Sequence, residues 1–366
     1  MTRENSNSKT MVEVVHKNCT YNCKNCFVSS TSSAPAEESR RVATKLTGKG
    51  HETSIWTSSM EKKGAISLCN EFGDWRSSKG KEDWVVELRD SLPHYTEDAP
   101  DGSSFEFSLH GHTSEIHNHL VRDTKNFDRV IGSLKEAKQR KEAKQRGMDK
   151  YFVNHVVHKK NYKHLEEFAQ LMTSLGVPLF RITKIVSSSA VSENIPDLLL
   201  EPDEIHEIIR QSNTLREKYR GKVVVGLAAD GFGKVLTKKR YNLIKMLCKM
   251  VPGQLRHHCE AGRKVFAVNS ETKEIYPCRY FLNANEGEIG TMGEDGQLQI
   301  DSNWKANFHD HLHQVEEPCR TCAILKWCGG GCRATAIAEH FQFTGRWNPF
   351  AGMKSCPVAN GVFKEH

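Results

Sequence analysis

Short apolar runs rich in β-branched and aromatic residues alternate along this chain with stretches of helical periodicity. The short runs are typical of strands, and apolar residues spaced three and four apart are typical of helices. Strands that alternate with helices predict a parallel sheet, either open or closed into a barrel. The predicted strands are residues 11–15, 53–57, 105–109, 151–157, 178–186 and 222–229.

The segment 126–147 carries a helical pattern that changes along its length. Its first part has apolar residues at helical spacing, and its second part is almost wholly charged, with the hexapeptide KEAKQR in tandem at 135–140 and 141–146. Because these residues are strong helix formers, we predict a solvated helix extension there rather than a binding surface. The segment 29–41 is predicted to be a loop.

Composition and charge describe a globular protein. Of the 366 residues, 27% are charged and 37% are hydrophobic, which excludes the disordered and membrane classes. The polar N-terminus lacks the apolar core of a signal peptide, and no run of about 18 apolar residues occurs. We therefore expect a cytoplasmic protein that contacts no membrane and keeps its cysteines reduced. The net charge of +7 comes without a nucleic-acid module, so no nucleic-acid partner is expected.

The first cysteines form an incomplete set of ligands. The stretch CTYNCKNCF places Cys19, Cys23 and Cys26 directly after the first predicted strand. Three thiols are one short of a structural zinc site, whereas a cubic 4Fe-4S cluster held by three thiolates leaves one iron for a small molecule. A cluster is the interpretation that explains the missing ligand, and a zinc site or chance spacing is the alternative.

A second group of cysteines lies in the last third of the chain. The stretch CRTCAILKWCGGGC has the spacing C-x2-C-x5-C-x3-C, with further cysteines before and after it. A zinc ribbon would use four of these thiols and leave the others without a role. The three consecutive glycines let the backbone pass close to a bulky group. This pattern predicts a C-terminal module held together by metal.

The N-terminal triplet, at the head of an alternating α/β chain, resembles the radical S-adenosylmethionine (radical SAM) superfamily. The C-terminal pattern resembles the SPASM extension of radical SAM maturases, and the segment CEAGRKVFAVNSETKEIYPC adds its Gly, its two-stranded pattern and its Tyr-Pro-Cys ending. The resemblance implies SAM and three 4Fe-4S clusters as cofactors. It also implies that SAM is split into methionine and a 5'-deoxyadenosyl radical, which abstracts hydrogen from the substrate.

The resemblance also assigns ligands to each cluster. It implies Cys19, Cys23 and Cys26 for the SAM cluster, Cys259, Cys278 and Cys332 for the first auxiliary cluster, and Cys319, Cys322, Cys328 and Cys356 for the second. The first auxiliary cluster is then one ligand short, and a substrate thiolate or another group would complete it. The two remaining cysteines, Cys69 and Cys248, are expected in the apolar core. Cys248 is also a weak candidate for a catalytic hydrogen donor, as in some family members.

Segments in the middle of the chain resemble the strands with which the family contacts SAM. FSLHGHTSEIHNHL and NHVVHKKNYKHLEEF imply Ser108 and Asn154 near the SAM ribose or carboxylate, at strand C-terminal ends. Arg122 could pair with a carboxylate or lie on the surface. The chain departs from the family pattern at Asn25, where an aromatic residue is usual. It also departs in TSIWTSSMEKKG, where Glu61 would substitute for the acid of a Gly-Gly-Glu-Pro motif.

Two histidine-rich segments, LHGHTSEIHNHL and FHDHLHQ, could suggest a metal site. Imidazole is a common metal ligand, but neither segment has the carboxylate-histidine pattern that such a site shows. We expect surface or supporting roles for these histidines.

These observations predict an α/β chain with a partial (β/α)6 TIM-like barrel and a C-terminal iron-sulfur SPASM domain. The predicted boundaries are 1–230 for the barrel, 231–258 for a helical linker and 259–366 for the SPASM domain. Because Cys19 lies near the first residue, we expect no fused leader-recognition domain. Leader binding would fall to a separate protein or to the catalytic domain.

The favoured function is the maturation of a ribosomally made peptide, by a thioether or carbon–carbon crosslink or by epimerisation. One alternative is a radical dehydrogenase or epimerase of a small molecule such as an aminoglycoside. Another is a sulfatase-type maturase that oxidises Cys or Ser to formylglycine. A non-catalytic iron-sulfur carrier would not need the barrel. The resemblance also implies an electron donor of the flavodoxin or ferredoxin type.

Overall fold

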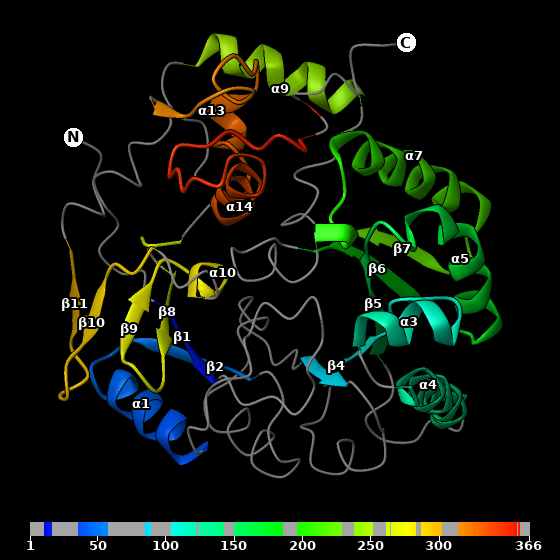
Figure 1. Cartoon of the computed structure of the whole chain (residues 1–366), viewed down its shortest axis with the longest axis horizontal. Coiled ribbons are helices and arrows are strands. Elements are labelled where there is room, and N and C mark those ends of the chain that lie inside the picture. The colour runs from blue at the N-terminus through cyan, green and yellow to red at the C-terminus, as the bar shows by residue number, and fades with distance from the viewer. Residues whose placement is uncertain are drawn as a thin grey trace. The chain divides into compact units, whose positions relative to one another are not determined.

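A computed structural model describes most of the chain, in two compact units. The described residues are 11–16, 36–57, 85–88, 104–121, 124–142, 150–185, 196–228, 238–251, 261–263, 265–282, 287–301, 314–356 and 358. Unit 1 comprises residues 1–20, 27–81 and 260–310, and unit 2 comprises residues 21–26, 82–259 and 311–366. Figure 1 labels the elements.

Unit 2 is built on a parallel sheet whose spatial order follows the chain. Its strands, from edge to edge, are β3 (Val85–Leu88), β4 (Ser104–Ser108), β5 (Lys150–Val157), β6 (Leu179–Lys184) and β7 (Val224–Leu227). Every neighbouring pair is parallel. The four strands predicted in this part of the chain are confirmed. The edge strand β3 was not predicted, because its four residues are too few to show a period.

Helices connect the strands of this sheet, as parallel neighbours require. They are α3 (Ser114–Val121), α4 (Asn126–Glu142), α5 (Leu165–Ser174) and α7 (Pro202–Lys218), with single turns η2 (Tyr162–His164) and η3 (Pro196–Leu198). At the start of α7, Pro202 is the first helical residue, and Glu204 accepts a hydrogen bond from the Glu201 N–H at 2.8 Å. Helix α4 confirms the helical pattern through the first KEAKQR repeat and into the second.

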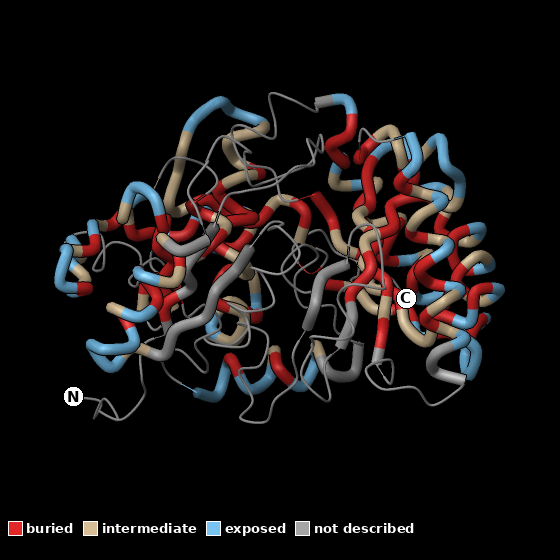
Figure 2. Tube along the Cα trace, turned by 90° about the horizontal axis from the view of Figure 1, so that it is seen from below, coloured by how far each residue is buried: buried red, intermediate tan, exposed pale blue. Residues whose placement is uncertain are grey.

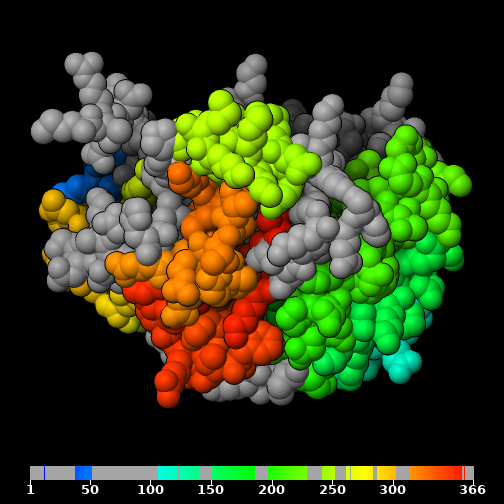
Figure 3. Space-filling view, turned by 90° about the horizontal axis from the view of Figure 1, so that it is seen from above, coloured from blue at the N-terminus to red at the C-terminus, as the bar shows by residue number. Residues whose placement is uncertain are grey.

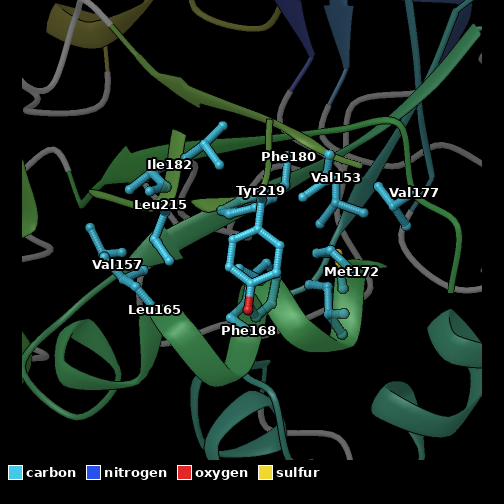
Figure 4. Close-up of a cluster of buried hydrophobic side chains, with 14 of the residues drawn as sticks. Val153, Val157, Leu165, Phe168, Met172, Val177, Phe180, Ile182, Leu215 and Tyr219 are labelled. Carbon is cyan, nitrogen blue, oxygen red and sulfur yellow. The ribbon is translucent and has the colours of Figure 1, made fainter. Parts of the chain in front are cut away.

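The core of unit 2 lies between this sheet and its helices. Along β6 half-buried and buried residues alternate, and the buried Phe180 and Ile182 face the helices. Figure 4 shows Phe168 and Met172 of α5 turned toward Val153 and Phe180 of the sheet. Each large apolar side chain fully buried in this way contributes about 1.5–3 kcal/mol. Figure 2 shows buried residues, in red, recurring among half-buried ones, in tan, along the chain.

The C-terminal part of unit 2 is helical and rich in turns. It contains α13 (Leu325–Cys328) and α14 (Arg333–Thr344). Helix α9 (Lys238–Met250), which lies in the predicted helical linker, packs against α13. The predicted domain boundaries at 230 and 258 remain a prediction.

Unit 1 is a mixed sheet that joins the start of the chain to its later part. In spatial order its strands are β11 (Leu298–Ile300), β10 (Gly290–Met292), β9 (Glu274–Tyr276), β8 (Val265–Asn269), β1 (Met11–His16) and β2 (Glu52–Thr57). Strand β1 is parallel to both β2 and β8, and the remaining pairs are antiparallel. The hairpin β8–β9 confirms the two-stranded pattern predicted between Cys259 and Cys278, and α10 (Arg279–Leu282) follows it.

The prediction of a loop over 29–41 is wrong at its C-terminal end. Helix α1 (Ala36–Gly48) begins inside that segment and buries Val42 and Leu46 in the core of unit 1. The sequence AEESRR consists mostly of good helix formers and follows Pro35, so it begins a helix. The predicted loop therefore ends before Ala36 rather than at residue 41. Within the part of the chain described here, no helix is both long and apolar enough to span a membrane.

Candidate functional site

Polar side chains line the face of the parallel sheet that points away from the helices. Successive residues of a strand face opposite sides, and the core-facing positions of β4, β5 and β6 are apolar apart from the buried His155 and Lys184. The register places Ser108 opposite Asn154, and Asn154 opposite Arg181. The Thr183 hydroxyl donates to the Asn154 side-chain oxygen. Ser108 ends β4, as predicted, whereas Asn154 lies within β5 rather than at its end.

An ion pair with a buried carboxylate crosses the same face. Arg181 Nη2 lies 3.1 Å from each carboxylate oxygen of Glu106, and the Glu106 side chain is 1% exposed. The Arg181 Nε atom is buried and has no hydrogen-bond partner among the described residues. The Arg181 side chain as a whole is 33% exposed, so its guanidinium is accessible to an anionic group. Neither residue was predicted from the sequence, although a charged residue inside an otherwise apolar strand is a usable signal.

Buried histidines hold the loop that follows β4. The His110 N–H donates to His117 Nδ1 at 2.9 Å, and His117 Nε2 lies 2.7 Å from Asn126 Oδ1. Asn161 Nδ2 donates to the His110 carbonyl at 2.8 Å. A Cβ atom on Gly111 would lie 2.6 Å from the backbone nitrogen of His117, so this position requires glycine. His110 and His117 are buried, so of the surface and supporting roles expected for these histidines they have the supporting one.

Four cysteines line one pocket in the C-terminal part of unit 2. The pocket encloses about 450 Å³ of empty space, part of it open to solvent, and Gly330 and Gly331 also line it. Its thiols are those of Cys319, Cys322, Cys328 and Cys356, the set predicted for the second auxiliary cluster. Gly329, Gly330 and Gly331 all have positive φ, between 69° and 81°. The glycines are therefore needed for a left-handed backbone as well as for close approach.

Local hydrogen bonds turn the chain around this pocket. The Cys322 N–H donates to the Cys319 carbonyl at 3.0 Å, and the Cys328 N–H donates to the Ile324 carbonyl at 2.8 Å. Burial raises the pKa of the Cys319 and Cys322 thiols. Binding a metal as thiolates would therefore release protons. The described residues contain no group of three or more side chains placed to bind a single metal ion.

An ion pair with both side chains buried contacts the residue next to the pocket cysteine Cys356. Lys184 of β6 contacts the Glu339 carboxylate of α14, with side chains 7% and 6% exposed. Lys184 Nζ also donates to Ser355 Oγ at 3.1 Å, and the Ser355 N–H donates to Glu339 Oε2 at 3.1 Å. Ser355 directly precedes Cys356, so this network ties the cysteine loop to the sheet. It was not predicted, because nothing in the sequence relates a lysine of β6 to a glutamate of α14.

The other predicted site residues divide into two groups. Cys278 follows β9 in unit 1, and Cys332 precedes α14 in unit 2. Cys248 is buried, as expected, in α9 beside the cysteine pocket. The remaining predicted residues lie outside the described part of the chain: Cys19, Cys23, Cys26, Glu61, Cys69, Arg122 and Cys259.

Comparison with solved structures shows that this chain shares its fold with SuiB and anSMEcpe, which confirms the predicted fold class and supports the resemblance at the level of the fold. Streptococcus suis SuiB bound to precursor peptide SuiA matches with a TM-score of 0.61 and 15% identity, over 94% of this chain and 75% of SuiB. SuiB bound to S-adenosylmethionine matches with a TM-score of 0.59 and 15% identity, over 94% and 76%. The anSMEcpe structure with bound AdoMet and Cp18Cys peptide matches with a TM-score of 0.61 and 13% identity, over 96% and 95%. No family model and no curated protein sequence matches the chain.

Proposed function

We propose that this chain is a radical SAM enzyme that modifies a ribosomally made peptide. The observation that carries the proposal is the pocket of four cysteines in a chain that shares its fold with SuiB and anSMEcpe. Both of those proteins have been solved with SAM and with a peptide. The proposed cofactors are SAM and three 4Fe-4S clusters.

The cysteine pocket fits a cubic cluster better than a single metal ion. Zinc in a structural site needs four ligands at about 2.0–2.3 Å from one centre, and the described cysteines do not converge on such a point. A cubic cluster distributes its four ligands over four irons. Cys319, Cys322, Cys328 and Cys356, spaced around one pocket, suit that larger group.

The proposal gives other residues of the chain separate roles. The resemblance supports Cys19, Cys23 and Cys26 as ligands of the SAM cluster, which when bound supplies the electron that splits SAM to the hydrogen-abstracting 5'-deoxyadenosyl radical. It likewise supports Cys259, Cys278 and Cys332 as ligands of the first auxiliary cluster, and Glu61 and Arg122 as further SAM contacts. On the polar face of the sheet, Ser108 and Asn154 offer hydrogen-bonding groups to a bound ligand. Arg181 offers a charged donor for the carboxylate of SAM or of the substrate.

SAM cleavage by the reconstituted protein tests the proposed function. We expect anaerobic reconstitution to load about 12 irons per chain and dithionite to drive the release of 5'-deoxyadenosine and methionine. Replacing Cys19, Cys23 and Cys26 together by alanine should remove about a third of the iron and abolish this release. Cys69→Ala, at a cysteine assigned to no cluster, is the matched control. Intact cleavage in the triple variant would refute the assignment.

The modified product separates the candidate reactions. A crosslinked peptide loses two hydrogens, an epimerised peptide keeps its mass, and formylglycine formation converts one Cys or Ser to an aldehyde. Mass spectrometry with peptides encoded beside the gene distinguishes these results. Turnover of an aminoglycoside-like molecule with no turnover of peptide would favour the small-molecule alternative.

A further inference from the structure

The outer face of α9 exposes a continuous stripe of large apolar side chains. The stripe comprises Leu243, Met246, Leu247, Met250 and the following Val251, which are 37–70% exposed. These residues are three and four positions apart and therefore share one side of the helix. Of the large apolar side chains that the described residues expose, only Val224 and Phe343 lie elsewhere. Figure 3 shows α9, in yellow-green, at the surface. Contiguous exposed apolar surface of this kind marks an interaction site.

The opposite face of α9 covers the cysteine pocket. Ile244 and Cys248 are both 5% exposed and pack with Ile324 and Val358. Three of the pocket cysteines, Cys322, Cys328 and Cys356, pack against this same cluster. Helix α9 therefore has two apolar faces, one buried over the thiols and one exposed. A core helix of a soluble protein needs only the first of these.

The charged residues of α9 are all basic, as is Lys326 of the neighbouring α13. Residues 238–251 contain four lysines and one arginine and no acidic residue. Lys249 is exposed, and the exposed Lys326 of α13 donates to the Val251 carbonyl at 3.5 Å, at the end of the stripe. An apolar stripe with a basic surround is complementary to an acidic partner. A second copy of this chain is disfavoured, because its formal net charge is +7 and like charges repel.

We propose that the outer face of α9 docks an acidic one-electron carrier protein. This inference rests on the proposed function, because it needs a redox group in the cysteine pocket. A helix with its side chains is about 10–12 Å across, so a partner on the outer face lies one helix diameter from the residues that pack against the thiols. One electron leaves the reduced carrier, which is oxidised, and the iron-sulfur group of the pocket gains it. No bond or proton changes place.

Charge reversal on α9 tests the docking surface in the full-length, anaerobically reconstituted protein. The probe is an acidic 2Fe-2S ferredoxin, used reduced for rapid-mixing kinetics and oxidised for binding. The variants are Lys245→Glu/Lys249→Glu and Met246→Ser/Met250→Ser. Lys222→Glu, at an exposed lysine before β7, is the matched control.

We expect the charge reversal to lower both the second-order rate of reduction and the ferredoxin affinity by about tenfold at low salt. The apolar variant should weaken binding at every salt concentration, whereas the effect of the charge reversal should fade as salt screens it. Reduction by dithionite, which needs no docking surface, should keep its wild-type rate in all variants.

The possible results separate the docking proposal from the proposed function. Wild-type ferredoxin kinetics and affinity in both α9 variants would overturn the docking proposal alone. An equal loss in Lys222→Glu, or a loss of precursor-peptide binding with ferredoxin binding intact, would do the same. A dimer that dissociates in the α9 variants would show that the face binds a second copy. If the wild-type protein takes up no iron that dithionite can reduce, the proposed function fails and the docking proposal fails with it.

Discussion

Replacing Lys184 by methionine should destabilise the protein more than any loss of a surface charge. Lys184 and Glu339 are both less than a tenth exposed, and they join β6 to α14. Both also hydrogen-bond with Ser355, which precedes Cys356. Removing the lysine leaves the Glu339 carboxylate buried without its counter-charge. Breaking a buried ion pair in this way typically costs about 3–5 kcal/mol.

The surroundings of the pair set the expected magnitude. Lys184, Glu339 and Ser355 border a pocket with about 380 Å³ of empty space, part of it open solvent, so water can reach an unpaired carboxylate. We therefore expect the lower end of the range, about 3 kcal/mol. For a folding unit of this size each kcal/mol lowers the Tm by about 2–4 °C. Lys184→Met should accordingly lower the Tm by roughly 6–12 °C.

Thermal unfolding followed by circular dichroism measures this loss, and a double variant isolates its cause. Lys184→Met/Glu339→Gln removes both charges but keeps an acceptor for the Ser355 N–H. It should recover most of the lost Tm, because replacing a whole buried pair is often neutral. Lys218→Met, at the exposed pair with Glu166, should leave the Tm unchanged. If Lys184→Met behaves like Lys218→Met, or if the double variant is no more stable than Lys184→Met, the buried pair does not hold this loop.

Three further predictions concern backbone strain, pH and close packing. Lys273 has φ +64° and contacts Glu38. Lys273→Gly should raise the free energy of unfolding by up to about 1 kcal/mol, because glycine relieves the left-handed backbone, whereas Lys273→Ala should lower it. The reverse order of the two variants in urea unfolding would contradict this. Burial lowers the pKa of His155 and of His158 to about 3, so the folded protein keeps them neutral. Unfolded histidine takes up a proton below about pH 6.5. The free energy of unfolding should therefore fall by about 1.4 kcal/mol per pH unit for each residue as the pH drops below that value. A His155→Gln variant that loses stability as steeply as the wild type between pH 6.5 and 5 would argue against it. A Cβ on Gly352 would lie 2.4 Å from the Glu317 carbonyl oxygen, whereas one on Gly132 meets nothing within 4 Å. Gly352→Ala should therefore lower the Tm and the iron content, and Gly132→Ala should lower neither. Equal effects of the two variants would refute the packing argument.

Local patterns in the sequence were sufficient to predict much of the fold. Runs such as 151–157 carry β-branched and aromatic residues that suit a pleated, half-buried surface, and they became strands. The spacing of Cys319, Cys322 and Cys328 also predicted their convergence, because residues this close along a turn and a short helix cannot lie far apart. The glycines that follow Cys328 were predicted to let the backbone pass close to a bulky group, and their left-handed φ appeared only in the structure.

Contacts between distant segments were decided by the tertiary structure alone. The pairing of β8 with β1, the meeting of Lys184 with Glu339 and the packing of Cys248 against the pocket all join residues far apart in the chain. The burial of His110 and His117 likewise depends on what surrounds the β4 loop. A hydrophobic period shows which face of an element is buried, but it does not show which other element covers that face. The partner of each buried charge and each buried thiol is chosen by long-range packing, and so it could be known only from the folded chain.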